Sequence, residues 1–269
     1  MRNTASRRSL RGRPPLPWIV LAALGAVLFL LPLLGLLART PWRRLPALLG
    51  SPVVTDALGL SLVSSLTATA VAAVLGIPLA WLLARTDFPG RGLLRGVVTL
   101  PLVLPPVVGG AALLFALGRR GLVGGPVADA TGLVLPFSLA GVVLANTFVS
   151  MPFLVLTVEG ALRAVDRRYE DVAASLGAGP WTVIRRVTLP LIAPSLASGL
   201  VLTWARAFGE FGATITFAGN LQGRTQTLPL AVFVALESDR DTAVAISLLM
   251  VGVALLVLVL LRDRWWGRV

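Results

Sequence analysis

The residues YEDVAASLGAGPWTVIRRVTLP, from Tyr169 to Pro190, form a polar, charged interruption in an otherwise apolar chain. Long apolar runs lie on both sides of this segment. A chain that folds an ordered helix into such a loop presents the loop to another molecule. We therefore expect this segment to be where the protein meets a partner.

A short helix is predicted within the loop, from Asp166 to Leu176. Asp166 is suited to cap its first turn, and Gly177 is suited to end it. Glu170 and Asp171 lie in its first turns, near the positive end of the helix dipole. The residues at the start, in the first turns and at the end of this segment therefore all favour a helix.

One face of the predicted helix carries Val172, Ala173 and Leu176, an apolar ridge flanked by charge. Such a ridge fits a groove on another protein. The alternative is an amphipathic helix on the bilayer surface. The ridge is thin, lacks a large aromatic side chain and lies beside acidic residues, which favours docking. Pro180 and Pro190 are expected to keep the flanking chain from merging with this helix.

The composition excludes an ordinary soluble domain. Hydrophobic residues make up 56% of the chain, charged residues make up 13%, and the mean hydropathy is +0.87. A soluble domain carries about 25% charged residues. The sequence therefore predicts an all-α membrane protein with several spans. The basic residues are all arginine and lie between apolar runs, so the net charge of +12 indicates orientation in a bilayer and no binding of nucleic acid.

The missing residue types narrow the chemistry. The chain has no cysteine and no histidine, which removes disulfides, thiol chemistry and the usual transition-metal ligands. It also has no lysine, which a Walker A loop places on the phosphates of ATP. We therefore expect no catalytic site, no bound metal and no ATP hydrolysis by this chain alone.

Six stretches are long enough to cross a bilayer, whose hydrocarbon core of ~30 Å takes about 20 helical residues. They are Pro17–Ala38, Leu58–Ala84, Gly96–Leu117, Leu133–Val158, Leu191–Phe217 and Thr242–Leu261. The chain is thus divided into a disordered arginine-rich leader (1–15), a first transmembrane helix (17–38), a membrane core (58–261) with a loop at 159–190, and a tail (262–269).

The arginines predict the orientation. With the N-terminus inside, the inner segments hold more than twice as many arginines as the outer loops, as the positive-inside rule requires. Both termini and the loop at 159–190 are therefore predicted to be cytoplasmic. The first stretch could be mistaken for a secretory signal, but its apolar run is too long and the following LLARTPW is a poor cleavage site.

The fifth predicted span contains two ionisable residues, Arg206 and Glu210, which are expected on one helix face. Ionisable groups inside a span cost several kcal/mol unless they are paired or hydrated. They are candidates either to line a solute path or to hold helix against helix, and both interpretations stay open. Thr214 is a further candidate for the same two roles. Gly209 and Gly212 are small enough to allow close helix approach.

Prolines interrupt the third predicted span. Pro101, Pro105 and Pro106 remove backbone donors and should kink or break the helix. Neighbouring helices or water must then satisfy the freed carbonyls. A break beside a solute path and a simple packing kink explain these residues equally well.

The loop resembles that of the permease subunits of ABC importers, whose pattern is EAA, three residues, Gly, nine residues, Ile, one residue, Leu-Pro. This chain keeps every spacing and departs in Asp for Glu, Val for the first Ala and Val for Ile. The resemblance implies a type I importer permease fold with six transmembrane helices and a coupling helix that seats in a cleft of the ATPase subunit. The implied coupling residues are Glu170, Asp171, Val172, Ala173, Ala174, Leu176, Gly177, Leu189 and Pro190.

Three further runs resemble molybdate permeases: GEFGAT from Gly209, LPLVLPPVVGG from Leu100 and GRRGLVG from Gly118. The resemblance covers residues 58–261. It implies import of molybdate, and of tungstate too, across a bacterial or archaeal cytoplasmic membrane. It also implies a second copy of this permease, an ABC ATPase dimer that holds ATP and Mg²⁺, and an extracytoplasmic molybdate-binding protein, with no cofactor on this chain.

Two other functions stay open. A sulfate or thiosulfate ABC permease would be the same machine with another anion. A secondary transporter or channel acting alone often shows an internal repeat and an intramembrane carboxylate relay. The sequence shows no repeat, and Glu210 is the single carboxylate expected within the spans. A membrane-embedded enzyme is disfavoured because the spans contain no pair of carboxylates.

Overall fold

A computed structural model describes residues 15–266, and every regular element in this range is helical. Five helices are long and apolar enough to cross a membrane, and a bent pair makes a sixth if it counts as one span. The five are α1 (Leu16–Arg39), α3 (Pro52–Arg85), α7 (Leu139–Ala164), the run Pro180–Phe208 and α13 (Arg240–Trp266). The predicted all-α membrane fold is confirmed, whereas the leader at 1–14 and the last residues at 267–269 lie outside the described range.

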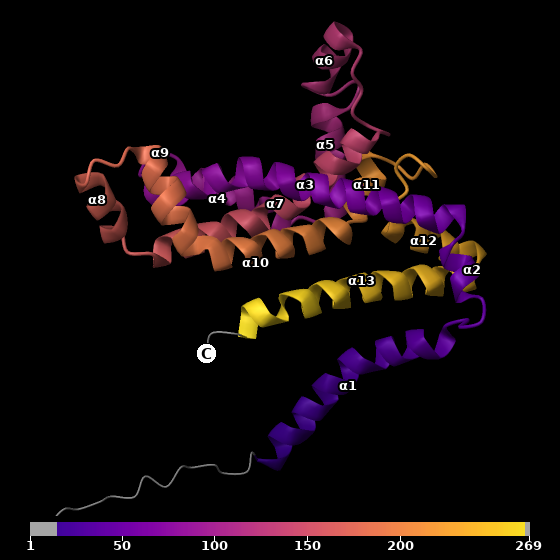
Figure 1. Cartoon of the computed structure of the whole chain (residues 1–269). Coiled ribbons are helices and arrows are strands. Elements are labelled where there is room, and N and C mark those ends of the chain that lie inside the picture. Colours follow the sequence, from indigo (N-terminus) through magenta and orange to yellow (C-terminus); the bar gives the residue numbers. More distant parts are fainter. Residues whose placement is uncertain (1–14, 267–269) are drawn as a thin grey trace, which may run out of the picture.

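The centre of the fold is a bundle of α3, α7 and α10 (Leu189–Phe208), which run alongside one another in Figure 1. The buried face of α3 carries small side chains at helical spacing, among them Ala68, Ala72, Gly76 and Ala80. Small residues let helix backbones approach closely inside a membrane. At Gly76 an added Cβ would lie 3.3 Å from Met151 on α7, so this approach is already tight.

A second cluster joins α3 to α12 (Leu228–Ser238) and α13 at the opposite end of the bundle from α8 (Figure 1). Its buried members include Val54, Phe208, Leu228 and Ile246. Asp239 caps the start of α13, and hydrogen bonds from the Thr242 hydroxyl and from backbone N–H groups lower the pKa of its carboxyl. The cap fixes the turn between α12 and α13.

The first span stands apart. Helix α1 has no buried residue, and a short helix, α2 (Leu45–Leu49), links it to α3. In Figure 1 it lies farther from the bundle toward its N-terminal end. A helix that is apolar all round and touches little protein is suited to face lipid.

The third predicted span is broken, as its prolines predict. Helix α4 (Arg91–Thr99) and the 3₁₀ turn at Leu100–Leu102 are followed by α5 (Pro106–Leu117), and the two halves meet at 118°. Helix α5 packs against α11 (Gly212–Phe217), and the hairpin of α5 and α6 (Gly124–Thr131) projects from the bundle in Figure 1.

Two expectations about the fifth span are wrong. The helix does not continue to Phe217, because α10 ends at Phe208 and α11 is a separate helix. At its other end the helix extends back through the π-helical turn η2 (Ile184–Thr188) to α9 (Pro180–Val183). Pro190 lies in the first turn of α10, where the wider π turn accommodates its missing N–H, and the continuous helix that begins at Pro180 stays separate from α8.

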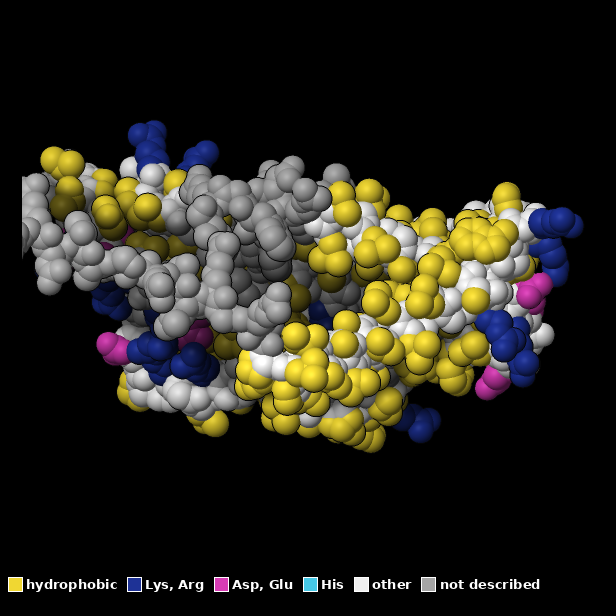
Figure 2. All heavy atoms as spheres, turned by 90° about the horizontal axis from the view of Figure 1, so that it is seen from below, with side chains coloured by type: hydrophobic (Ala, Val, Ile, Leu, Met, Phe, Trp, Pro, Cys, Tyr) yellow, Lys and Arg dark blue, Asp and Glu magenta, His cyan; other side chains and the backbone are white. Residues whose placement is uncertain are grey.

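The surface separates charge from apolar side chains. In the described part of the face in Figure 2, hydrophobic side chains cover most of the surface, and most of the arginines and acids lie toward the two ends. This distribution is the one a bilayer requires, because its core excludes unpaired charge while its surfaces accept arginine.

Candidate functional site

The predicted loop helix exists and forms one end of the molecule as α8 (Arg168–Ser175) (Figure 1). The Asp166 carboxylate accepts a hydrogen bond from the Arg168 N–H at 3.0 Å, at the entry to the helix, whose N-cap position is occupied by Arg167. Gly177 follows the helix with φ of 85°, and its N–H donates to the Ala174 carbonyl. A glycine suits this left-handed position because a Cβ would strain it.

The apolar ridge of α8 is exposed. Val172 is 58% and Leu176 is 83% exposed, while Ala173 is half-buried. The structure adds two aromatic side chains that the sequence reasoning left out. Tyr169 precedes Val172 by one helical turn, and Trp181 stands on α9 across the loop; both are largely exposed. The loop therefore does present large aromatic side chains, which removes one argument against the bilayer-surface alternative. The thin ridge and the adjacent acidic residues still favour docking.

Glu170 does not face outward with its neighbours. Its Oε1 atom accepts hydrogen bonds from Arg85 Nη2 at 2.9 Å and from the Thr188 hydroxyl at 2.9 Å. Arg85 is the last residue of α3, and Thr188 is the last residue before α10. Glu170 thus ties α8 to two core helices, a role that the sequence pattern does not reveal.

The other predicted coupling residues divide into two groups. Asp171 and Ala174 are exposed on α8 beside the ridge. Leu189 and Pro190 begin α10, and Leu189 packs against the core cluster of α3, α7 and α10. The family motif therefore spans both the exposed helix and the core helix that follows it.

A second acid, which the sequence analysis overlooked, is buried near the same end. Glu159 is 1% exposed and lies on α7, which continues to Ala164 and so beyond the predicted end of the fourth span. Its carboxylate pairs with Arg163 at 2.7 Å and with Arg95 of α4 at 3.3 Å. The expectation that Glu210 is the single carboxylate within the spans is therefore wrong.

Arg206 and Glu210 do pair, although Glu210 lies beyond the end of α10. The Arg206 Nη1 to Glu210 Oε2 distance is 2.5 Å, and Glu210 is buried. The other oxygen of Glu210 accepts the Ala213 N–H at 2.8 Å, at the start of α11. One carboxylate thus fixes the break between the two helices.

Thr214 is also fully buried and takes part in an interhelical network. Its hydroxyl donates to Asn146 Oδ1 of α7 at 3.2 Å, and Asn146 Nδ2 donates to the Ser64 hydroxyl of α3 at 3.4 Å. These contacts join α3, α7 and α11. Among the described residues, no group of three or more acidic side chains could hold a metal ion.

Small residues set the contact between α5 and α11. An added Cβ at Gly110 would lie 2.7 Å from the Ala213 carbonyl oxygen, and one at Gly212 would lie 2.8 Å from Pro106. Gly212 therefore lies against the first residue of α5, at the break of the third span.

Replacing Gly110 with alanine is expected to destabilise the protein by about 1–3 kcal/mol, because the added methyl group overlaps the α11 backbone. The matched control is Gly96→Ala in α4, where nothing lies within 4 Å of the added atom. Thermal unfolding in detergent should separate the two variants. Equal melting temperatures would show that α5 and α11 are not in the described contact.

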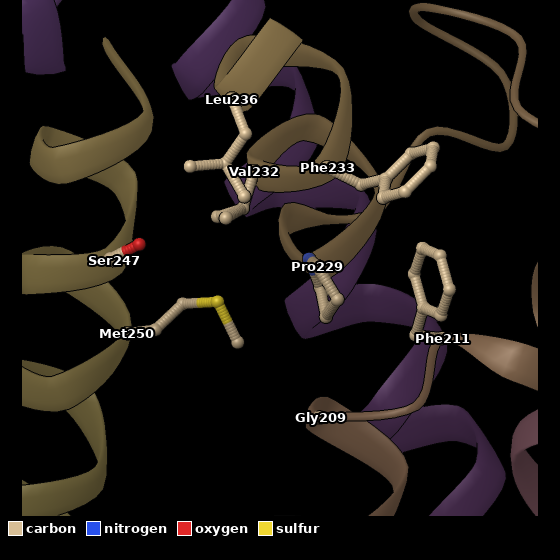
Figure 3. A pocket seen from close by; sticks show the side chains of 8 residues that line it. All are labelled: Gly209, Phe211, Pro229, Val232, Phe233, Leu236, Ser247 and Met250. Carbon is tan, nitrogen blue, oxygen red and sulfur yellow. The ribbon is translucent and has the colours of Figure 1, made fainter. Parts of the chain in front are cut away.

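Gly209 borders an open apolar groove of about 410 Å³ (Figure 3). Phe211 lines it from the break between α10 and α11, Phe233 from α12 and Met250 from α13. The rings of Phe211 and Phe233 lie 5.3 Å apart. The groove has no charged lining, so it is not suited to hold an oxyanion.

A helical membrane protein with an exposed, motif-bearing loop helix at one end of its bundle is the architecture of a transporter subunit. The chain belongs to the family of binding-protein-dependent transport system inner membrane components, whose match covers residues 76–268. It is therefore a multi-pass inner membrane subunit without a catalytic role of its own.

Two individual relatives and one solved structure resemble the chain over most of its length. The molybdenum transport system permease protein ModB of Mycobacterium bovis is 50% identical over 89% of this chain and 91% of its own length. The ModB protein of Escherichia coli K12 is 41% identical over 81% of this chain and 96% of its own. A crystal structure of a bacterial alginate ABC transporter in complex with alginate pentasaccharide-bound periplasmic protein shares the fold, with a TM-score of 0.68 and 19% identity over 90% of this chain and 92% of that one.

Proposed function

We propose that this chain is the permease of an ATP-driven importer of molybdate, which accepts tungstate as well. The relatives at 50% and 41% identity are named as molybdenum permeases and match the chain over most of its length. The GEFGAT run that suggests an oxyanion permease spans the break after α10 and the first turn of α11. Molybdate and tungstate are tetrahedral dianions of similar shape, so one route serves both.

The segment from Asp171 to Gly177 is proposed as the ATPase contact. The observation that carries this proposal is an exposed apolar ridge on a helix that Gly177 ends in a left-handed turn. An exposed ridge of this kind gains free energy when a partner groove covers it. The ATPase dimer supplies the site for ATP and Mg²⁺, and this chain binds neither.

Two further partners complete the transporter. A second copy of the permease forms the other half of the path, and an extracytoplasmic molybdate-binding protein delivers the anion. The related alginate transporter has been crystallised with a periplasmic protein, which supports the proposal of a binding protein as a partner. ATP binding would close the ATPases and move α8, so that the spans open toward the binding protein as rigid bodies.

The arginine distribution supports an orientation with α8 and both termini in the cytoplasm of a bacterium or archaeon. The pair of Arg206 and Glu210 is proposed to hold helices together and not to contact the anion. Both oxygens of Glu210 are already occupied, one by Arg206 and one by the Ala213 N–H. Thr214 is likewise used by Asn146.

Competition between oxyanions tests the substrate. In vesicles that contain the permease with its ATPase and binding protein, tungstate is expected to suppress uptake of labelled molybdate, and equimolar sulfate is expected to leave it unchanged. Tungstate and sulfate carry the same charge, so a difference between their effects would not come from charge alone. Suppression by sulfate as strong as that by tungstate would favour a sulfate permease instead.

A further inference from the structure

The Glu170 carboxylate connects three helices at one point. A single oxygen, Oε1, accepts from Arg85 at the end of α3 and from Thr188 at the start of α10. The side chain of Arg85 is 6% exposed and that of Glu170 is 19% exposed. Bonds to a charged group are strong when water is excluded, so this joint resists being pulled apart.

The end of α3 is also held by Arg163 of α7 and by Arg167, the residue that immediately precedes α8. Arg163 Nη2 donates to the Leu83 carbonyl and Arg167 Nη2 donates to the Arg85 carbonyl, both at 3.4 Å. These carbonyls lie at the negative end of the α3 dipole, where a cation is favoured. The end of α3, the end of α7 and the start of α8 therefore meet at one corner, and Arg85 extends from this corner to Glu170.

The other hydrogen bond from the α8 end to α3, from Arg167 to the Arg85 carbonyl, is long at 3.4 Å and exposed to solvent. The ridge side chains Tyr169, Val172 and Leu176 are exposed. Residues 176–179 join α8 to α9 without helical structure. The backbone of this linker therefore transmits little of any movement of α8 to α9 and α10. Within the part of the chain that the structure describes, the side chain of Arg85 donates to Glu170 alone.

We propose that Glu170 is the positioning residue that transmits movement of α8 to α3 and α10. This inference rests on the proposed function, because it needs an ATPase that moves α8. Displacement of α8 pulls on Arg85 and Thr188 together, so the two core helices move with it. The ridge holds the ATPase, whereas Glu170 holds the membrane helices. Loss of the joint should leave docking intact and uncouple hydrolysis from transport.

Three variants test this proposal in proteoliposomes that contain the complete transporter. Glu170→Ala is expected to lower molybdate uptake by about tenfold or more, since it leaves a buried arginine without its partner. Thr188→Val preserves the side-chain shape and the ion pair, so it should cause an intermediate loss. Glu170→Gln keeps an acceptor oxygen for both donors and should recover part of the uptake. In all three, the ATPase should still co-purify and hydrolyse ATP.

The control is Asp87→Asn, which neutralises a carboxylate that also pairs with an arginine, Arg91, but is 91% exposed. Its uptake should match that of the wild-type protein, because exposed pairs contribute little. Uptake within twofold of wild type in Glu170→Ala would overturn the proposal. So would a joint loss of co-purification, hydrolysis and uptake in Thr188→Val, which would indicate a merely structural role. A wild-type transporter that fails to import molybdate would instead contradict the proposed function.

Discussion

Replacing Gly177 with aspartate is expected to abolish molybdate uptake while the protein remains in the membrane. The residue ends α8 with φ of 85° and follows the exposed Leu176, and nothing lies within 4 Å of an added Cβ. The free permease therefore has room for the new side chain. The loss arises when the ATPase covers the loop, because the new carboxylate must then be buried without a partner. Uptake should be compared with the amount of permease in isolated membranes.

Two controls separate charge from backbone strain. Gly177→Asn has nearly the same size, tolerates the left-handed conformation and carries no charge, so it should retain measurable uptake. Gly179→Asp places the same charge two residues away, where φ is −68° and the start of α9 favours an acid. It should retain more uptake than Gly177→Asp. Normal uptake by Gly177→Asp would show that the loop is not the docking element.

Removal of the Glu210 carboxylate is expected to have the largest effect on stability. Glu210→Ala deprives Arg206 of its partner and leaves the Ala213 N–H without its acceptor in a buried place. Breaking a buried pair in this way costs about 3–5 kcal/mol. We expect the amount of folded permease to fall sharply, and uptake to fall with it. Thermal unfolding and the yield of detergent-extracted protein measure the change.

The exposed pair of Arg44 and Asp241 provides the comparison. Their side chains are 65% and 42% exposed at a distance of 2.6 Å, so Arg44→Met should cost less than about 1 kcal/mol. Arg206→Met should fall between the two, because Glu210 would keep its bond to Ala213. A Glu210→Ala protein as stable as the wild type would contradict the interhelical role of this pair.

Features that depend on neighbouring residues were predictable from the sequence. The helix from Asp166 to Leu176 follows from local caps, and the structure places α8 within these limits. The break in the third span follows from prolines that remove donors and clash with a continuing helix. In both places the chain decides its own local structure, so one sequence suffices.

Features that depend on tertiary contacts were not predictable. The apolar pattern continues past Phe208, yet the helix ends there because Glu210 turns back to cap α11 and to pair with Arg206. Hydropathy likewise placed Glu159 at a loop boundary, whereas Arg95 and Arg163 hold it inside the protein. Glu170 pairs with Arg85, which lies 85 positions before it, and with Thr188, which lies 18 positions after it. Motif spacing along one chain does not reveal such contacts.

The central claim is that this subunit moves molybdate only when an ATPase acts on its α8 loop. Purified permease should be reconstituted in vesicles with and without the ATPase, in the presence of the binding protein and ATP, and the internal molybdate concentration should be measured. The claim predicts accumulation above the external concentration with the ATPase and none without it. Uphill accumulation by the permease alone would contradict it.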